Sequence, residues 1–69
     1  MTTTGKRIEW LRKKRRWTVS QLAKESRVGE NTIRLIENGG DCRLSTLILI
    51  AAALEIPAAL LVPWEEAET

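Results

Sequence analysis

A capping signal followed by a glycine is the feature that most constrains how this chain can fold. Thr18 and Gln21 stand three residues apart, so the Thr18 hydroxyl can accept from the amide of Gln21 while the Gln21 side chain accepts from the amide of Thr18. This pattern predicts a helix that begins at Val19. The helix must end near Arg27, because Gly29 opens another helix. The sequence therefore predicts two short helices joined by a turn of about three residues.

Helical periodicity continues on both sides of this pair. Ile8, Leu11 and Arg15 share one face of a first helix, with Arg12 beside it. The Gly39-Gly40 pair is typical of a helix end, and Pro57 is typical of a first turn. We expect a single all-α domain, residues 1–69. Its helices are expected at residues 5–16, 19–26, 30–38, 44–54 and 58–62, followed by a short acidic tail, 65–69.

The third expected helix has a polar face of unusual composition. At about 100° per residue, Ile33, Ile36 and Glu37 fall on one side of it. The other side carries short amides, a guanidinium and an apolar side chain, where a merely solvated helix usually carries Lys and Glu. This composition predicts that the second face has a binding partner. Its residues are Asn31, Arg34, Leu35 and Asn38.

Charge is distributed unevenly along the chain, although the net charge is only +2. Residues 1–36 hold ten Lys and Arg against three Glu, a balance of +7. Residues 37–69 hold one Arg against six acidic residues, a balance of −5. A basic half opposite an acidic half favours a polyanion approached from one side, either nucleic acid or a membrane surface. A protein partner is also compatible with this pattern.

Residue content argues against an enzyme. The chain has no His, no Tyr, one Cys, no glycine-rich phosphate loop and no cluster of metal ligands, so we expect no catalytic residues, no cofactor and no metal site. A single cysteine and the absence of a signal-like start predict a cytoplasmic protein. We expect no membrane span, because Glu55, Pro57 and Pro63 interrupt the apolar run of residues 44–64.

The stretch WTVSQLAKESRVGENTIRLIENG, residues 17–39, resembles the helix-turn-helix of the lambda-repressor and Cro-like (XRE-type) family of bacterial and phage regulators. The likeness covers about residues 5–62. It implies a five-helix DNA-binding domain, commonly dimeric, in which the second and third helices form the motif. The agreeing positions are Ile8, Leu11, Arg12, Leu22, Ala23, Val28, Ile33, Ile36, Glu37, Gly39, Leu44, Thr46, Leu47, Ile50, Ala51, Ala53 and Leu54.

The resemblance also implies which residues contact double-stranded DNA. The third helix would enter the major groove and contact bases, Asn31 through its amide to adenine and Thr32 or Leu35 through methyl groups to thymine. Glu30 could accept from cytosine or could instead serve at the helix start. An ion pair between Arg12 and Glu37 is implied as well. The expected base contacts are Glu30, Asn31, Thr32, Arg34 and Leu35, and the expected phosphate contacts are Thr18, Val19, Lys24, Arg27 and Asn38.

Some positions depart from the family pattern. Val19 stands where Gln is common, while Arg16 and Arg27 stand where glycine is common, so these turns must take a non-glycine form or accept strain. The fourth helix is apolar nearly all round, which predicts burial on more than one side. We expect a self-association surface made of Leu49, Ala52, Ile56, Ala58, Leu61 and Trp64. Trp10 lies opposite the core face of the first helix, where the tail or a partner could cover it.

These features predict a transcription regulator that binds a pseudo-palindromic operator as a homodimer. It would act as a repressor by occlusion, or as an activator by contact with polymerase. The alternative is an antitoxin-like or other protein-interaction module, whose apolar half masks a partner and whose DNA binding is secondary or non-specific. Cys42 is expected to be a small loop residue, since a redox switch there would need an activated thiolate.

Overall fold

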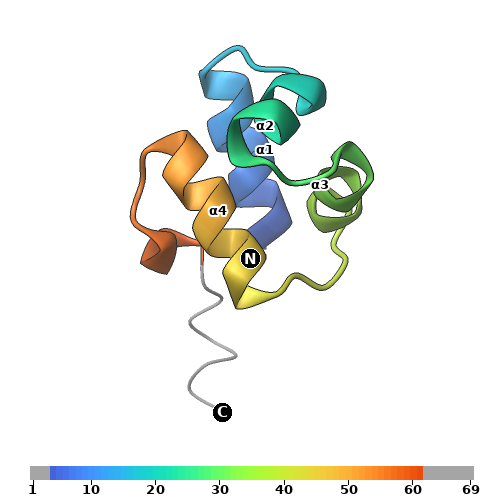
Figure 1. Ribbon diagram of the computed structural model, residues 1–69, viewed down its shortest axis with the longest axis vertical. Coiled ribbons are helices and arrows are strands. Elements are labelled where there is room, and N and C mark those ends of the chain that lie inside the picture. Colours follow the sequence, from blue (N-terminus) through green and yellow to red (C-terminus); the bar gives the residue numbers. More distant parts are fainter. Residues whose placement is uncertain (1–3, 62–69) are drawn as a thin grey trace.

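Helix follows helix throughout residues 4–61, the part of the chain that the computed structural model describes (Figure 1). Four α-helices are followed by one short 3-10 helix, η1, and the all-α class is confirmed. The helices follow the expected order along the chain. They are α1 (Thr4–Lys14), α2 (Val19–Ser26), α3 (Glu30–Glu37), α4 (Leu44–Leu54) and η1 (Ala58–Leu60).

Four boundaries differ from the sequence prediction, and the first is the start of α1, at Thr4 instead of residue 5. Helix α1 ends at Lys14 rather than residue 16, because Arg16 takes a left-handed conformation with φ 60°. Helix α3 ends at Glu37, one residue earlier than expected. The expected fifth α-helix, 58–62, is a three-residue 3-10 helix in the described chain, closed by a hydrogen bond from the Leu61 amide to the Ala58 carbonyl at 2.9 Å. Residue 62 and the acidic tail, 65–69, lie outside the described residues.

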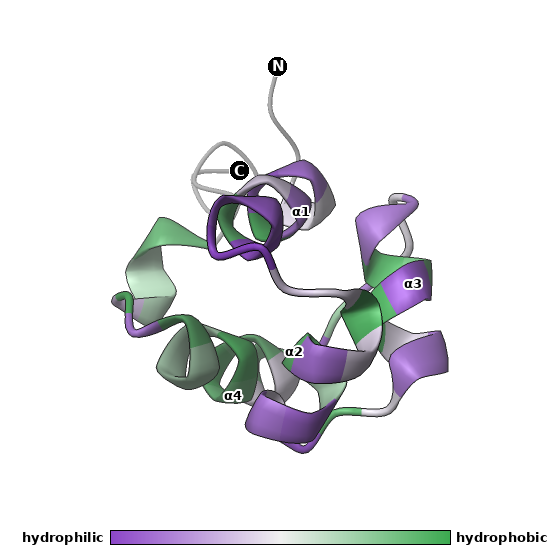
Figure 2. Cartoon of the chain, turned by 90° about the horizontal axis from the view of Figure 1, so that it is seen from above, coloured by the Kyte–Doolittle hydropathy of each residue, from purple (hydrophilic) through white to green (hydrophobic). Residues whose placement is uncertain are grey.

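The hydrophobic core lies where α1, α2, α3, α4 and the end of η1 meet. Helix α1 packs against α3, α2 packs against both α3 and α4, and η1 packs against α4. Hydrophobic residues are concentrated on α4, while α2 carries a more hydrophilic outer side (Figure 2). Burying each large apolar side chain contributes about 1.5–3 kcal/mol. The largest fully buried side chains are Ile8, Leu22, Ile33, Ile36, Ile50 and Leu61.

Gly5 allows α1 and α3 to approach closely. A Cβ atom at this position would clash with the carbonyl oxygen of Ile36 and would lie 3.0 Å from the Cα of Glu37. These atoms belong to the backbone of α3, so they cannot rotate away as a side chain could. The absence of a side chain at Gly5 therefore determines how near α1 can lie to α3.

Left-handed residues other than glycine end three of the helices. Arg16 follows α1, Arg27 is the C-cap of α2 and Glu55 is the C-cap of α4, with φ values of 60°, 61° and 59°. Such a conformation costs an L-residue roughly 1–2 kcal/mol. The sequence left open whether the turns at Arg16 and Arg27 take a non-glycine form or accept strain. The structure shows that both residues accept strain.

Candidate nucleic-acid interface

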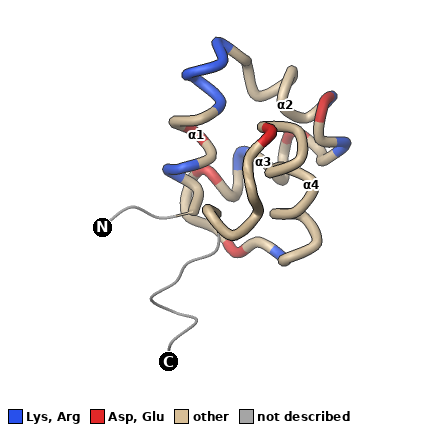
Figure 3. Tube along the Cα trace, turned by 90° about the vertical axis from the view of Figure 1, so that its left-hand side faces the viewer, with Lys and Arg blue, Asp and Glu red and all other residues tan. Residues whose placement is uncertain are grey.

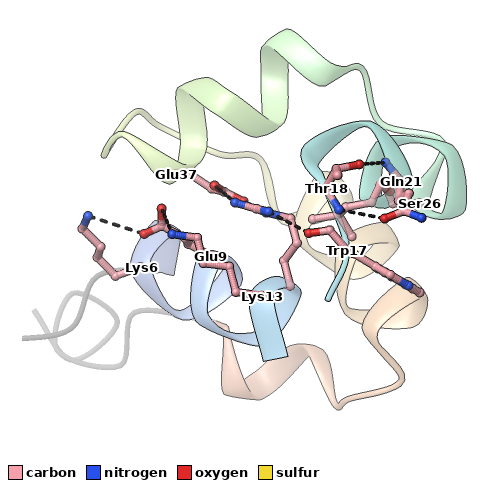
Figure 4. Close-up of polar contacts among 10 residues, drawn as sticks. Lys6, Glu9, Lys13, Trp17, Thr18, Gln21, Ser26 and Glu37 are labelled. Atoms are coloured by element: carbon pink, nitrogen blue, oxygen red, sulfur yellow. Dashed lines mark hydrogen bonds and ion pairs between the residues drawn. The ribbon is translucent and has the colours of Figure 1, made fainter. Parts of the chain in front are cut away.

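The capping box at the start of α2 is present as predicted. The Gln21 amide donates to Thr18 Oγ1 at 3.1 Å, and the Thr18 amide donates to Gln21 Oε1 at 2.8 Å (Figure 4). Because the box uses the amides of Thr18 and Gln21, the amides of Val19 and Ser20 are the ones at this end without an acceptor inside the helix. These two amides lie at the N-terminus of α2, the positive end of the helix dipole, and this position favours the binding of an anion.

The turn between α2 and α3 is held by a serine. Ser26 Oγ donates to the Leu22 carbonyl at 2.7 Å and accepts from the Val28 amide at 3.3 Å. Ser26 and Val28 are both buried, so the turn is attached to the core. Gly29 then caps α3 in an extended conformation, without a side-chain hydrogen bond. These contacts fix the placement of α3 relative to α2.

Helix α3 has one buried and one exposed face, as the sequence predicts. Ile33, Ile36 and Glu37 are buried. The side chains on the other face are all exposed, including Leu35, an apolar residue with 59% of its surface accessible. The expected base-contacting residues therefore share one surface, and no other helix of the described chain covers it. They are Glu30, Asn31, Thr32, Arg34 and Leu35.

A buried ion pair ties α3 to α1. Arg12 donates from Nε to Glu37 Oε2 at 2.8 Å and from Nη2 to Glu37 Oε1 at 3.0 Å, the bidentate geometry that carboxylates and guanidinium groups favour. Arg12 Nη1 also donates to the Trp17 carbonyl at 2.8 Å (Figure 4). The hydrogen bond to Glu37 raises the pKa of Arg12, although burial acts in the opposite direction. One side chain thus joins α1, α3 and the segment that leads into α2.

A second ion pair lies on the exposed face of α3. Arg34 Nη1 lies 3.3 Å from Glu30 Oε1, one helical turn away, and both side chains are well exposed. An exposed pair of this kind contributes only about 0.3–0.5 kcal/mol. Either side chain can therefore leave its partner at little cost when a ligand approaches.

Comparison with known proteins gives one match. A family model described as Helix-turn-helix matches residues 8–61. The chain belongs to the lambda-repressor-like helix-turn-helix family. This is a family of DNA-binding domains and not of enzymes. Searches of curated proteins and of solved structures give no significant match.

Exposed polar side chains flank the helix-turn-helix formed by α2 and α3. Thr18, Lys24, Arg27 and Asn38, four of the expected phosphate contacts, are all exposed. Val19 differs from them, because its side chain is half-buried against the core, which leaves its backbone amide as the group for a phosphate contact. Arg27 and Asn38 stand at the C-caps of α2 and α3.

The basic run of residues 12–16 divides between structural and surface roles. Figure 3 shows the positions of Lys and Arg along the chain in blue. Lys13 Nζ lies 3.4 Å from Glu9 Oε2, and the Lys14 ammonium lies 4.7 Å from the centre of the Trp10 ring. Arg15 donates to the Leu54 carbonyl at 3.2 Å and to Glu55 Oε1 at 2.6 Å, so it caps the end of α4. Sequence reasoning did not predict this capping role, although it placed Arg15 on the core side of its helix.

The expected self-association surface is only partly present in the helix-turn-helix domain. Leu49 and Ala52 are exposed on α4, but Ile56 and Ala58 pack against the core. Including Leu61 was wrong, because its side chain is fully buried within its own chain. Trp64 lies outside the described residues.

Two further residues belong to this exposed side of α4. Leu44 and Ile48 are 60% and 50% exposed, and helical spacing places them beside Leu49 and Ala52. The described chain covers α4 on one side only, through Leu47, Ile50, Ala51 and Leu54. The expectation that α4 is buried on several sides is therefore not met within one copy. The exposed residues, Leu44, Ile48, Leu49 and Ala52, are called the α4 apolar face below.

The sequence predictions also concern the Cys42 thiol, metal sites and membrane-spanning helices. Cys42 Sγ donates to the Arg43 carbonyl at 3.4 Å, and burial raises the pKa of its thiol, which disfavours an activated thiolate. Within residues 4–61 no group of three His, Cys, Asp or Glu could hold a metal ion. Over the same residues no helix is long and apolar enough to cross a membrane.

Proposed function

We propose that this chain is a transcription regulator that binds a specific site on double-stranded DNA by placing α3 in the major groove. One observation carries the proposal: the polar face of α3 is exposed, while the opposite face is fixed in the core and by the Arg12–Glu37 pair. A rigid helix with an uncovered face of short polar side chains is the element that a helix-turn-helix presents to base edges.

The base contacts are proposed from the chemistry of each side chain. The Asn31 amide can donate and accept at once, which matches the major-groove edge of adenine. Thr32 and Leu35 can contact a thymine methyl group, and Arg34 can donate to guanine after it leaves Glu30. Glu30 is exposed at the first turn of α3, where it can accept from a cytosine amino group or stabilise the helix dipole.

Phosphate contacts would hold α3 in register. The uncommitted amides of Val19 and Ser20 at the start of α2 can bind one phosphate, as helix N-termini do. Thr18, Lys24, Arg27 and Asn38 are exposed beside the motif and would contact the flanking backbone. These contacts would contribute affinity without reading sequence.

The test compares a base reader with a phosphate contact. Asn31→Ala should cost about 1–3 kcal/mol on a duplex selected for binding and little on random DNA. Lys24→Ala is the matched control, since losing a phosphate contact should weaken both duplexes alike and reduce the salt dependence by about one unit of slope. Equal losses on the two duplexes for Asn31→Ala would show that Asn31 does not read a base.

We further propose that the α4 apolar face joins two copies into a homodimer. Leu44, Ile48 and Leu49 leave a contiguous apolar surface uncovered on a domain of 69 residues, and a small domain gains stability from a second copy. The two α3 helices would then lie roughly 34 Å apart on a pseudo-palindromic site, with repression by occlusion as the simplest action.

Sedimentation of the wild type and of Ile48→Glu tests the homodimer, because only the wild type should sediment as a dimer at micromolar concentration. A monomeric wild type would contradict it.

The same face supports a second candidate, an antitoxin-like role in which an unrelated protein covers α4. Its exposed leucine and isoleucine side chains would suit such a partner as well as a second copy. Purification from the native host separates the two possibilities. A stoichiometric unrelated protein that is lost with Ile48→Glu would favour this candidate over the homodimer.

A further inference from the structure

An open groove lies along α1, beside η1. Its volume is about 930 Å³. Two large apolar side chains that line the groove are exposed to solvent. Trp10 has 60% of its surface accessible and Leu60 has 53%. In Figure 1, η1 and α3 lie on opposite sides of the molecule, so the groove is separate from the DNA-binding surface proposed above. The lining residues are Lys6, Arg7, Glu9, Trp10, Leu11, Lys13 and Leu60.

The charge around the groove is strongly positive. Lys6, Arg7 and Lys13 line it, and Lys14 lies over the Trp10 ring, which makes four cations. Glu9 is the one acidic residue among the described residues of the lining, and it lies 3.6 Å from Lys6 and 3.4 Å from Lys13. Among these described residues, cations therefore outnumber carboxylates. An apolar floor with a cationic rim suits a segment that combines an aromatic side chain with several carboxylates.

The chain itself contains such a segment. Residues 62–69 read VPWEEAET, so Trp64 is followed by three carboxylates, those of Glu65, Glu66 and Glu68. The segment follows directly from the groove wall. The Leu60 carbonyl accepts from Arg7 Nη1 at 2.7 Å, and the Leu61 carbonyl accepts from Thr4 Oγ1 at 2.7 Å. These two bonds hold the residues from which the segment continues against the start of α1.

Length allows the segment to follow the whole groove. Lys6 and Lys13 are separated by seven residues of helix, or about 10 Å at 1.5 Å per residue. Eight extended residues can span up to roughly 26 Å. Because the segment is covalently attached at the groove, its effective concentration there is in the millimolar range, so even weak contacts would hold it.

We propose that residues 62–69 of each chain bind in the α1 groove of the same chain, with Trp64 against Trp10 and Leu60 and the three glutamates against the cationic rim. This assigns Trp64 to the α1 groove and removes it from the dimer surface expected from the sequence. The proposal is independent of DNA binding, since it uses none of the residues of the helix-turn-helix surface.

Paramagnetic relaxation in the full chain tests the proposal. A nitroxide label at Ala67→Cys, in a Cys42→Ser background, should selectively weaken the amide signals of residues 6–13 and the Trp10 indole signal. The matched control carries the same label with Glu65→Gln, Glu66→Gln and Glu68→Gln. Its broadening should be much weaker, as should that of the first variant at high salt. Circular dichroism confirms that both variants keep the same helices.

Three results would overturn the proposal. Uniform weak broadening over the whole chain would show that the segment does not occupy the groove. Broadening centred on α3 or α4 would place the segment elsewhere. Broadening that is seen only between labelled chains and separate isotope-enriched chains would mean that a second copy supplies the segment.

Discussion

Arg12 differs most from its neighbours in the basic run, because its charge is buried rather than solvated. Its guanidinium group makes three hydrogen bonds, two to Glu37 and one to the Trp17 carbonyl. No buried side-chain nitrogen or oxygen of the described residues lacks a hydrogen-bond partner. The family resemblance predicts this pair, whereas charge patterning alone does not distinguish Arg12 from Lys13 or Lys14.

Removing one partner of this pair should be costly. Arg12→Met should lower the free energy of unfolding by about 3–5 kcal/mol, because it leaves the Glu37 carboxylate buried without a counter-charge. The double variant Arg12→Met with Glu37→Leu should recover a large part of that loss. Urea denaturation measures both. Replacing an exposed arginine should lower the free energy of unfolding by less than about 0.5 kcal/mol. A loss this small for Arg12→Met would contradict the burial of the pair.

Relieving the backbone strain at Arg16 should raise the free energy of unfolding, whereas removing Arg12 should lower it. Arg16→Gly should raise the free energy of unfolding by about 0.5–1 kcal/mol, since glycine relieves the left-handed strain but gains entropy in the unfolded chain. Arg16→Ala keeps the strain and serves as the control. Thermal melts of the two variants decide the matter, and equal melting temperatures would argue against strain at this residue.

The Cys42 thiol should react slowly at neutral pH. Burial raises its pKa, so the fraction present as thiolate at a given pH is smaller than for an exposed cysteine, and the alkylation rate should level off at a higher pH. Because the unfolded chain gives up this proton more readily, the same shift lowers stability as pH rises through the unfolded-state pKa. The pH midpoint of the reaction with iodoacetamide, measured with and without urea, reports the shift. Equal midpoints in both conditions would contradict it.

At the scale of elements, local signals predict boundaries better than they predict contacts. The start of α2 follows from Thr18 and Gln21 alone, because both partners of the capping box lie within one turn. The two faces of α3 likewise follow from helical periodicity. The early end of α1 was not predicted, since helical periodicity continues through Arg16; only the family pattern, in which glycine is common at this position, indicated strain there. The roles of Gly5 and Arg15 depend on which helices pack together, which periodicity does not specify.

Gly5 tests the close approach of α1 and α3. Gly5→Ala should lower the free energy of unfolding by about 1–3 kcal/mol, because the new methyl group must push α1 away from the backbone of α3. This loss opposes the higher helix propensity of alanine. Gly29→Ala is the control, because a Cβ there would meet only Thr32 Oγ1 at 3.9 Å. A Gly5→Ala variant that is more stable than the wild type would refute the tight contact.

For the whole molecule, the charge asymmetry and the exposed surfaces point to three separate contacts. In the proposed function the helix-turn-helix would present α3 to DNA, the α4 apolar face would contact a second copy, and the groove beside Trp10 would bind an acidic segment. The sequence predicts which residues of α3 are exposed, because they lie on one face of one helix, while their contacts with DNA stay a prediction. It predicts the second surface only in part, since whether Ile56, Ala58 and Leu61 face solvent depends on how η1 packs.

The most direct test of the central claim is selection of bound duplexes from a random-sequence pool, followed by salt titration of the best duplex and a scrambled one. We expect enrichment of a two-fold-symmetric site that contains an A·T pair opposite Asn31, with a difference in affinity that persists at physiological salt. No enrichment, together with binding that is lost equally and steeply from both duplexes as salt rises, would contradict sequence-specific recognition by α3.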